Sequence, residues 1–181
     1  MTEQQTYDVV LLVEQPLSAM DARQVRSLHE GIEDPVRYHV VLPVEDAAAR
    51  VESAMGSLAA GEVLASPTIM LSDVNLEEIQ QEILENARDD VSACVDRMAQ
   101  AGGNAVGSLV NMDPIDAVAA KVKEVDAAEV IIMTRPHVVA EFFHLDWSSR
   151  ARRKLGVPVL HLLEHENFDE QAGGGEGSTG M

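Results

Sequence analysis

The sequence has few aromatic residues, one cysteine and no long apolar run. Aromatic residues make up 3% of the 181 residues, so a core must be built from aliphatic side chains, which suits buried strands covered by helices. The single cysteine, Cys94, excludes an internal disulfide and is typical of a reducing cytoplasm. Runs such as 9–13 and 130–133 are far shorter than the roughly 18 residues of a membrane span. Residues 1–5 are polar and do not resemble a secretion signal, so we expect a cytoplasmic protein.

Basic residues are also scarce. The chain has 13 Lys and Arg against 31 Asp and Glu, for a formal net charge of −18. Nucleic-acid binding depends on cations that displace counterions from phosphates, and docking to anionic lipid needs the same charge sign. We therefore expect neither nucleic acid nor a membrane surface as a partner. The simplest interpretation of the acidity is solubility or a high-salt habitat.

What the chain does contain is an alternation of short apolar runs and helical patterns. We expect strands at residues 8–14, 39–44, 105–110, 129–134 and 157–163, and helices at 18–30, 46–58, 75–101, 113–125 and 139–155. This alternation predicts a doubly wound α/β fold, with a five-stranded, mostly parallel sheet and helices on both faces. Residues 7–165 would form one domain, while the N-terminal 1–6 and the acidic, glycine-rich 166–181 would be disordered.

Local signals define three of these helices. Ser18 with Asp21 predicts a capping box, and Asn75 with Glu78 predicts a second. Asp113 before a proline predicts the start of another helix, because proline is tolerated at the first helical position. On the long helix after Asn75 an apolar stripe at helical spacing includes the cysteine, which we therefore interpret as packing rather than a reactive thiol.

Ligands of doubly wound sheets bind outside the carboxyl ends of the strands, where the strand order reverses. The residues at the ends of the predicted strands or shortly after them are therefore the candidate ligand-binding residues: Glu14, Gln15, Val44, Asp113, Thr134, Arg135 and His137.

The last third of the chain resembles the universal stress protein family. The resemblance is carried by Asp113-Pro114 at a helix start, by 128–134 (AEVIIMT) as a strand and by 156–160 (GVPVL) at the close. With a compatible first strand it extends over residues 7–164. It implies an adenine nucleotide alpha hydrolase-like domain that is cytoplasmic, often binds ATP, and is usually a homodimer through the last strand, here 157–163.

The glycine pattern of the ATP-binding members is missing. Those members carry Gly, two residues, Gly, nine residues and Gly-Ser or Gly-Thr after the fourth strand, and an Asp after the first strand that faces adenine. Here Glu14 takes the Asp position, and no glycine lies between Thr134 and Lys154. Glycine lets backbone N–H groups approach phosphate, and Pro136 removes an N–H outright. We therefore expect no ATP bound in the usual family manner and no resident cofactor.

The sequence leaves open a different ligand at the carboxyl ends of the strands, because Arg135 and His137 carry groups that contact anions. An adenine nucleotide held differently is one such ligand. His137, His144 and Asp146 lack the usual spacing of metal ligands, so we expect no metal site. The aromatic residues at 142, 143 and 147 are interpreted as core packing or a subunit seam.

No catalytic residue is identified, because the sequence offers no base, nucleophile or phosphate loop in a recognisable arrangement. We therefore lean toward a non-catalytic, homodimeric stress-response protein, with unknown partner proteins. The alternative is a binder of a nucleotide or small metabolite with weak phosphohydrolase activity.

Overall fold

A computed structural model describes residues 6–44, 75–134 and 153–163. In these ranges the chain forms five strands and three helices, and one helical turn at 153–155 precedes the last strand. The elements are, in chain order, β1 (Tyr7–Val13), α1 (Ala19–Ser27), β2 (Val36–Pro43), α3 (Leu76–Gln100), β3 (Asn104–Val110), α4 (Pro114–Val125), β4 (Glu129–Thr134) and β5 (Val159–Leu163). The predicted helix at 46–58, most of that at 139–155, and both terminal segments lie outside the described residues.

The five strands form one sheet in the order β3-β2-β1-β4-β5, and every pairing is parallel. The chain moves outward from β1 to β2 and β3, then returns to place β4 on the other side of β1. The strand order therefore reverses between β1 and β4, whose register joins Val9 to Glu129 and Val13 to Met133. This arrangement confirms the predicted doubly wound fold, and the sheet is fully parallel rather than mostly so.

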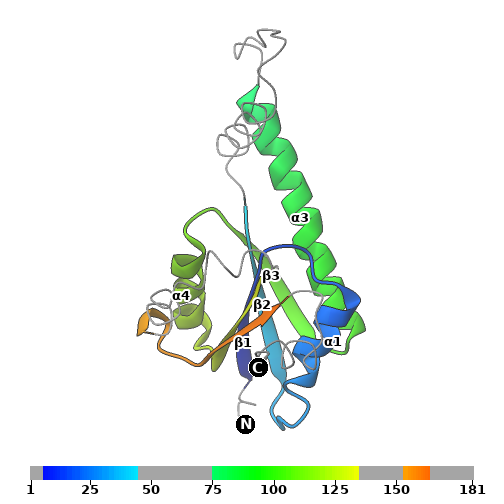
Figure 1. Ribbon diagram of the computed structural model, residues 1–181, viewed down its shortest axis with the longest axis vertical. Helices are drawn as coiled ribbons and strands as arrows, with labels where there is room; N and C mark the ends of the chain where they lie inside the picture. Colours follow the sequence, from blue (N-terminus) through cyan, green and yellow to red (C-terminus); the bar gives the residue numbers. More distant parts are fainter. Residues whose placement is uncertain (1–5, 45–74, 135–152, 164–181) are drawn as a thin grey trace, which may run out of the picture.

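Helices cover both faces of the sheet (Figure 1). On one face α1 and α3 pack on alternate strand residues such as Leu11, Val40 and Ile131. On the other, α4 and the turn at 153–155 pack on the residues between them, including Leu12 and Ile132. The central strands are buried on both sides, which explains why their sequence is continuously apolar rather than alternating.

The helix starts follow the predicted capping signals. Ser18 accepts a hydrogen bond from the Asp21 amide at 3.1 Å, and Asp21 accepts one from the Ser18 amide at 2.8 Å, so the capping box is complete. Asn75 accepts from the amides of Glu77 and Glu78 and so caps α3, but a complete capping box occurs at α1 alone among the described helices. The α1 helix ends at Ser27, earlier than predicted, because the chain closes into turns with hydrogen bonds three residues apart.

The 25 residues of α3 make a helix roughly 37 Å long, which extends past the sheet in Figure 1. Its second half packs on β2 and β3, and Cys94 is fully buried there, as predicted. Gly107 on β3 allows this packing, since an added Cβ would lie 2.6 Å from the Val91 side chain. Leu76, at the start of the predicted apolar stripe, is 47% exposed. None of the described helices is long and apolar enough to cross a membrane.

Candidate functional site

A pocket of about 120 Å³ lies between the carboxyl ends of β1 and β4, at the point where the strand order reverses. The strand ends of β1, β2 and β4 and the start of α4 form its walls. Its lining consists of Leu12, Val13, Glu14, Pro43, Asp113, Pro114, Ile115, Ile132, Met133 and Thr134. Seven of these ten residues are apolar, so the walls favour an uncharged, largely apolar group.

Three polar side chains lie in this lining, and all three were predicted from the sequence. Glu14 directly follows β1. Asp113 caps α4 by accepting hydrogen bonds from the amides of Ile115 at 3.0 Å and Asp116 at 3.1 Å, which fixes it at the pocket rim. Thr134 ends β4 and is 8% exposed.

The hydroxyl of Thr134 lies 2.8 Å from Nε2 of His161, on the neighbouring strand β5. His161 was predicted as part of the last strand and was not among the candidate site residues. Burial lowers the pKa of its imidazole, so the neutral ring is favoured at neutral pH.

The other predicted site residues lie elsewhere. Val44 packs against the core under α1 and α3, and its amide donates to the carbonyl of Val110 at 2.8 Å, while Pro43 forms the β2 wall of the pocket. Gln15 is half-buried and does not line the pocket. Arg135 and His137 lie outside the described residues.

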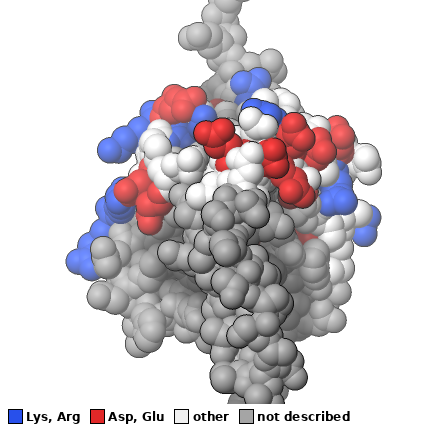
Figure 2. Space-filling view, turned by 90° about the horizontal axis from the view of Figure 1, so that it is seen from above, with Lys and Arg blue, Asp and Glu red and all other residues white. Residues whose placement is uncertain are grey.

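The charged side chains among the described residues of the lining are all negative. Figure 2 shows the molecule from above, where the surface of the described residues carries several groups of acidic side chains with basic side chains beside them. The described lining includes Glu14 and Asp113 but no Lys, Arg or His. Nor do the described ranges contain a cluster of three side chains that would hold a metal ion. A polyanion therefore meets repulsion here from the described residues.

Ionised carboxylates accept hydrogen bonds and donate none. The chemistry of the pocket is therefore that of a small apolar slot with acceptors at its rim. Its volume is near that of a dry cavity of about 150 Å³ that holds benzene, and below the roughly 300 Å³ at which sites for drug-sized ligands begin. One flat ring system is the scale of ligand that it fits.

Solved structures with the same architecture come from several organisms. No protein-family model and no curated protein sequence matches the chain. The hypothetical protein MJ0577 is 10% identical with a TM-score of 0.59, over 89% of this chain and 98% of that one. UspA from Lactobacillus plantarum is 15% identical with a TM-score of 0.52, over 87% and 99%. A universal stress protein family member from Arabidopsis thaliana, solved with AMP bound, is 14% identical with a TM-score of 0.51, over 90% and 94%.

This chain has the universal stress protein fold. The expectation drawn from the sequence resemblance is confirmed at the level of architecture. The bound AMP is an observation on the Arabidopsis thaliana protein alone.

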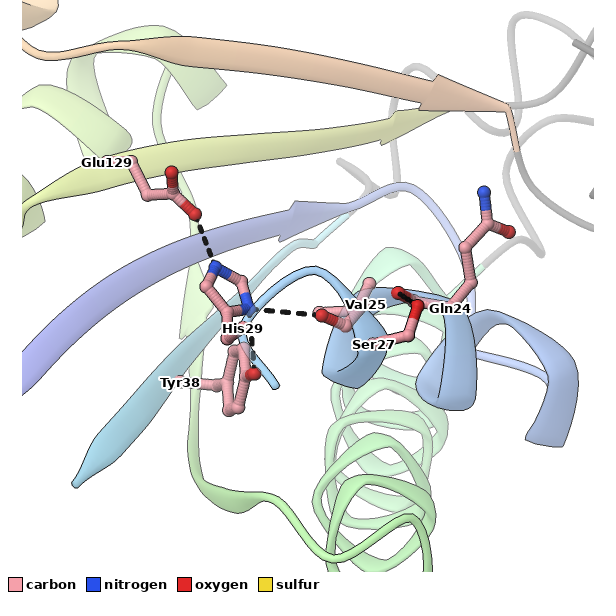
Figure 3. A network of polar contacts seen from close by, with 6 residues as sticks. All are labelled: Gln24, Val25, Ser27, His29, Tyr38 and Glu129. Carbon is pink, nitrogen blue, oxygen red and sulfur yellow. Dashed lines mark hydrogen bonds and ion pairs between the residues drawn. The ribbon is translucent and has the colours of Figure 1, made fainter. Parts of the chain in front are cut away.

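A second polar cluster in this universal stress protein fold lies at the opposite, amino ends of the strands, and sequence reasoning missed it. Its centre is His29, which follows α1 and is 3% exposed. Nε2 of His29 lies 2.5 Å from the Glu129 carboxylate, and Nδ1 lies 2.9 Å from the Tyr38 hydroxyl and 3.1 Å from the Val25 carbonyl (Figure 3). The cluster ties α1 to the start of β2 and β4.

Tyrosine rings enclose the imidazole. The Tyr38 ring meets it edge-on at 5.4 Å, and the Tyr7 ring lies at 6.0 Å. Burial raises the pKa of Tyr38 to about 12, with Glu129 adding to the rise and Arg26 opposing it. Burial, followed by Glu129, also raises the pKa of Tyr7. Because Tyr38 is fully buried, a substrate has no access to its hydroxyl, and the cluster is interpreted as a stabilising tie.

Proposed function

We propose that this chain is a non-catalytic regulatory protein of the universal stress type that binds a neutral, amino-substituted aromatic base of the adenine kind. The observation that carries the proposal is the apolar pocket between β1 and β4 with Glu14 and Asp113 at its rim. The base alone, or its nucleoside, is the proposed ligand, and ATP held by its phosphates is not.

The apolar walls support a ring as the bound group. Leu12, Ile115 and Ile132 offer aliphatic surface from three different elements. Removing such surface and a flat ring from water is favourable by roughly 25 cal/mol for each Å² buried. Glu14 follows β1, where the resemblance places the residue that faces adenine, and its carboxylate accepts a hydrogen bond from an exocyclic amino group.

Charge argues against a phosphate-led mode of binding. The described lining carries two carboxylates and no basic side chain. The sequence after β4 has no glycine before Gly156, so it lacks the residues that bring backbone N–H groups close to phosphate. Fixed negative charges near a triphosphate raise the free energy of its bound state.

A non-catalytic role is proposed because the polar lining residues lack an arrangement for chemistry. Asp113 is engaged in capping α4, and Thr134 is paired with His161. The second pairing sets an imidazole against a hydroxyl of the lining, but the described lining carries no basic side chain to stabilise the charge that develops when a nucleophile attacks. Binding would therefore act through occupancy of the pocket, as in a sensor.

The proposed assembly is a homodimer through β5. This strand lies at the edge of the sheet and pairs only with β4 among the described residues. A strand with a neighbour on one side can add a strand of a second copy on the other, and Leu160 on β5 is 37% exposed. In sedimentation equilibrium we expect the wild type to be a dimer and Leu160→Lys to be a monomer that still binds ligand. A wild-type monomer would remove the dimer from the proposal.

Isothermal titration calorimetry with adenosine, ATP and uridine tests the ligand. We expect adenosine to bind, uridine to bind more weakly because it lacks the amino group, and ATP to bind no more tightly than adenosine. An ATP affinity at least ten times that of adenosine would mean that phosphates direct the binding. No heat from any nucleoside would overturn the proposed ligand class.

A further inference from the structure

The Thr134 hydroxyl has one hydrogen-bond partner among the described residues, Nε2 of His161 at 2.8 Å. Thr134 is 8% exposed and lines the pocket. Thr134 ends β4 and pairs with Leu163 in the β4–β5 register, and His161 lies two residues before Leu163, opposite Ile132. His161 therefore lies behind the pocket wall and contacts the ligand site through Thr134.

The direction of this hydrogen bond follows from burial. A buried O–H group that finds no acceptor costs about 1–3 kcal/mol, whereas an unused lone pair on the same oxygen costs less. A neutral imidazole has one nitrogen that accepts, and the lowered pKa of His161 favours the neutral ring. The hydroxyl of Thr134 thus donates to His161, and the proton of the imidazole lies on Nδ1.

A hydroxyl whose proton is committed to His161 presents only lone pairs to the pocket. Glu14 and Asp113, the other polar lining residues, also present acceptors. The described lining therefore has acceptor side chains but no free side-chain donor. Such a lining accepts the N–H groups of an amino substituent and leaves a carbonyl oxygen of the ligand without a partner.

We propose that His161 is the specificity-determining residue of the pocket, because it holds the Thr134 proton and so makes the site select amino-substituted over carbonyl-substituted bases. The inference rests on the proposed function, since it concerns the same pocket. His161 is a positioning residue. A purely structural role for it predicts that its replacement weakens the binding of both bases equally.

The experiment compares adenosine with inosine, which carries a carbonyl where adenosine carries the amino group. Dissociation constants of both are measured by calorimetry for the wild type, His161→Phe and Thr134→Val. We expect the wild type to prefer adenosine roughly 10-fold, the ratio that one unpaired polar group produces. In His161→Phe the freed hydroxyl donates to the carbonyl, so inosine binds more tightly and the preference falls roughly fivefold or more.

Thr134→Val removes the acceptor and keeps the shape, so adenosine should bind more weakly while inosine changes little. This variant tests the proposal even where His161→Phe does not fold. The matched control is His39→Phe, which removes a buried histidine paired with Asp8 at 2.7 Å near the opposite ends of the strands. It should leave the preference at its wild-type value.

The contrary outcomes distinguish a failure of the inference from a failure of the proposed function. If His161→Phe weakens both nucleosides equally, or if Thr134→Val keeps the wild-type ratio, His161 does not set the selectivity and the inference is overturned, while the proposed binding stands. If the wild type binds both nucleosides equally, the same conclusion follows. If the wild type binds neither, the proposed function fails and the inference fails with it.

Discussion

The two ends of the sheet use polar side chains in opposite ways. At the amino ends, His29 contacts Glu129, Tyr38 and the Val25 carbonyl, so these polar groups satisfy one another inside the fold. At the carboxyl ends, Glu14 and Asp113 line a pocket whose other walls are mostly apolar.

The difference separates stability from binding. Polar groups that are buried and paired stabilise one arrangement of the elements, and removing one partner leaves the others unsatisfied. Polar groups at the rim of an apolar pocket are also placed to contact a ligand. Substitutions at the amino ends should therefore change the free energy of unfolding without affecting ligand binding. Substitution of Glu14 at the carboxyl ends should do the reverse, whereas Asp113 both lines the pocket and caps α4.

The largest expected effect is at the centre of the amino-end cluster. His29→Ala removes the imidazole from Tyr38 and Glu129 and leaves a cavity, and it should lower the free energy of unfolding by about 3 kcal/mol. Urea denaturation measures this loss, and calorimetry should show unchanged adenosine affinity for the folded variant. A loss below roughly 0.5 kcal/mol, the scale of a surface substitution, would mean that the cluster contributes little.

Alkaline pH should break the same cluster without a mutation. The folded pKa of Tyr38 is about 12 and the ordinary value is 10.0, so the folded state holds the tyrosine proton more tightly than the unfolded state. The stabilisation is therefore complete below pH 10 and is lost as the pH rises toward 12, by about 2–3 kcal/mol in total. Chemical denaturation between pH 9 and 12 measures it. Tyr38→Phe should show a correspondingly shallower decline.

At the carboxyl ends, Glu14→Gln should weaken adenosine binding by roughly 10-fold, because a charged acceptor is replaced by a neutral amide. The free energy of unfolding should change by less than about 0.5 kcal/mol. Asp96→Asn is the matched control, since it removes one negative charge from the exposed side of α3. Equal losses of affinity in both variants would point to long-range charge rather than to the pocket.

The smallest effect tests an exception at α1. Gln24 is 8% exposed, and neither polar atom of its amide has a hydrogen-bond partner among the described residues. Figure 3 shows its side chain pointing away from the His29 cluster. Gln24→Met should raise the free energy of unfolding by about 1 kcal/mol, because it removes an unsatisfied polar group at similar volume. A thermal melt that moves downward would show that the amide is needed.

The fold could be predicted from the sequence because its signals are local. The continuous apolar run of β1, the Ser18–Asp21 capping box and Pro114 at the first position of α4 each act within a few residues. The end of α1 was less predictable. The chain closes there in turns whose hydrogen bonds join residues three apart, and no local sequence signal indicated these turns.

The site could be predicted in part for the same reason. Glu14, Asp113 and Thr134 each follow or end a predicted strand, so topology alone places them at one edge of the sheet. The pairs could not be predicted. His29 and Glu129 are 100 residues apart, and Thr134 and His161 are 27 apart, so their meeting depends on strand order and register.

Methyl NMR with added adenosine tests the separation of the two ends most directly. We predict shift changes at the methyl groups of Leu12, Ile115 and Ile132, which line the pocket, and none at Val25, which contacts His29. Shift changes centred on Val25, or no change at the three pocket residues under saturating adenosine, would contradict the account.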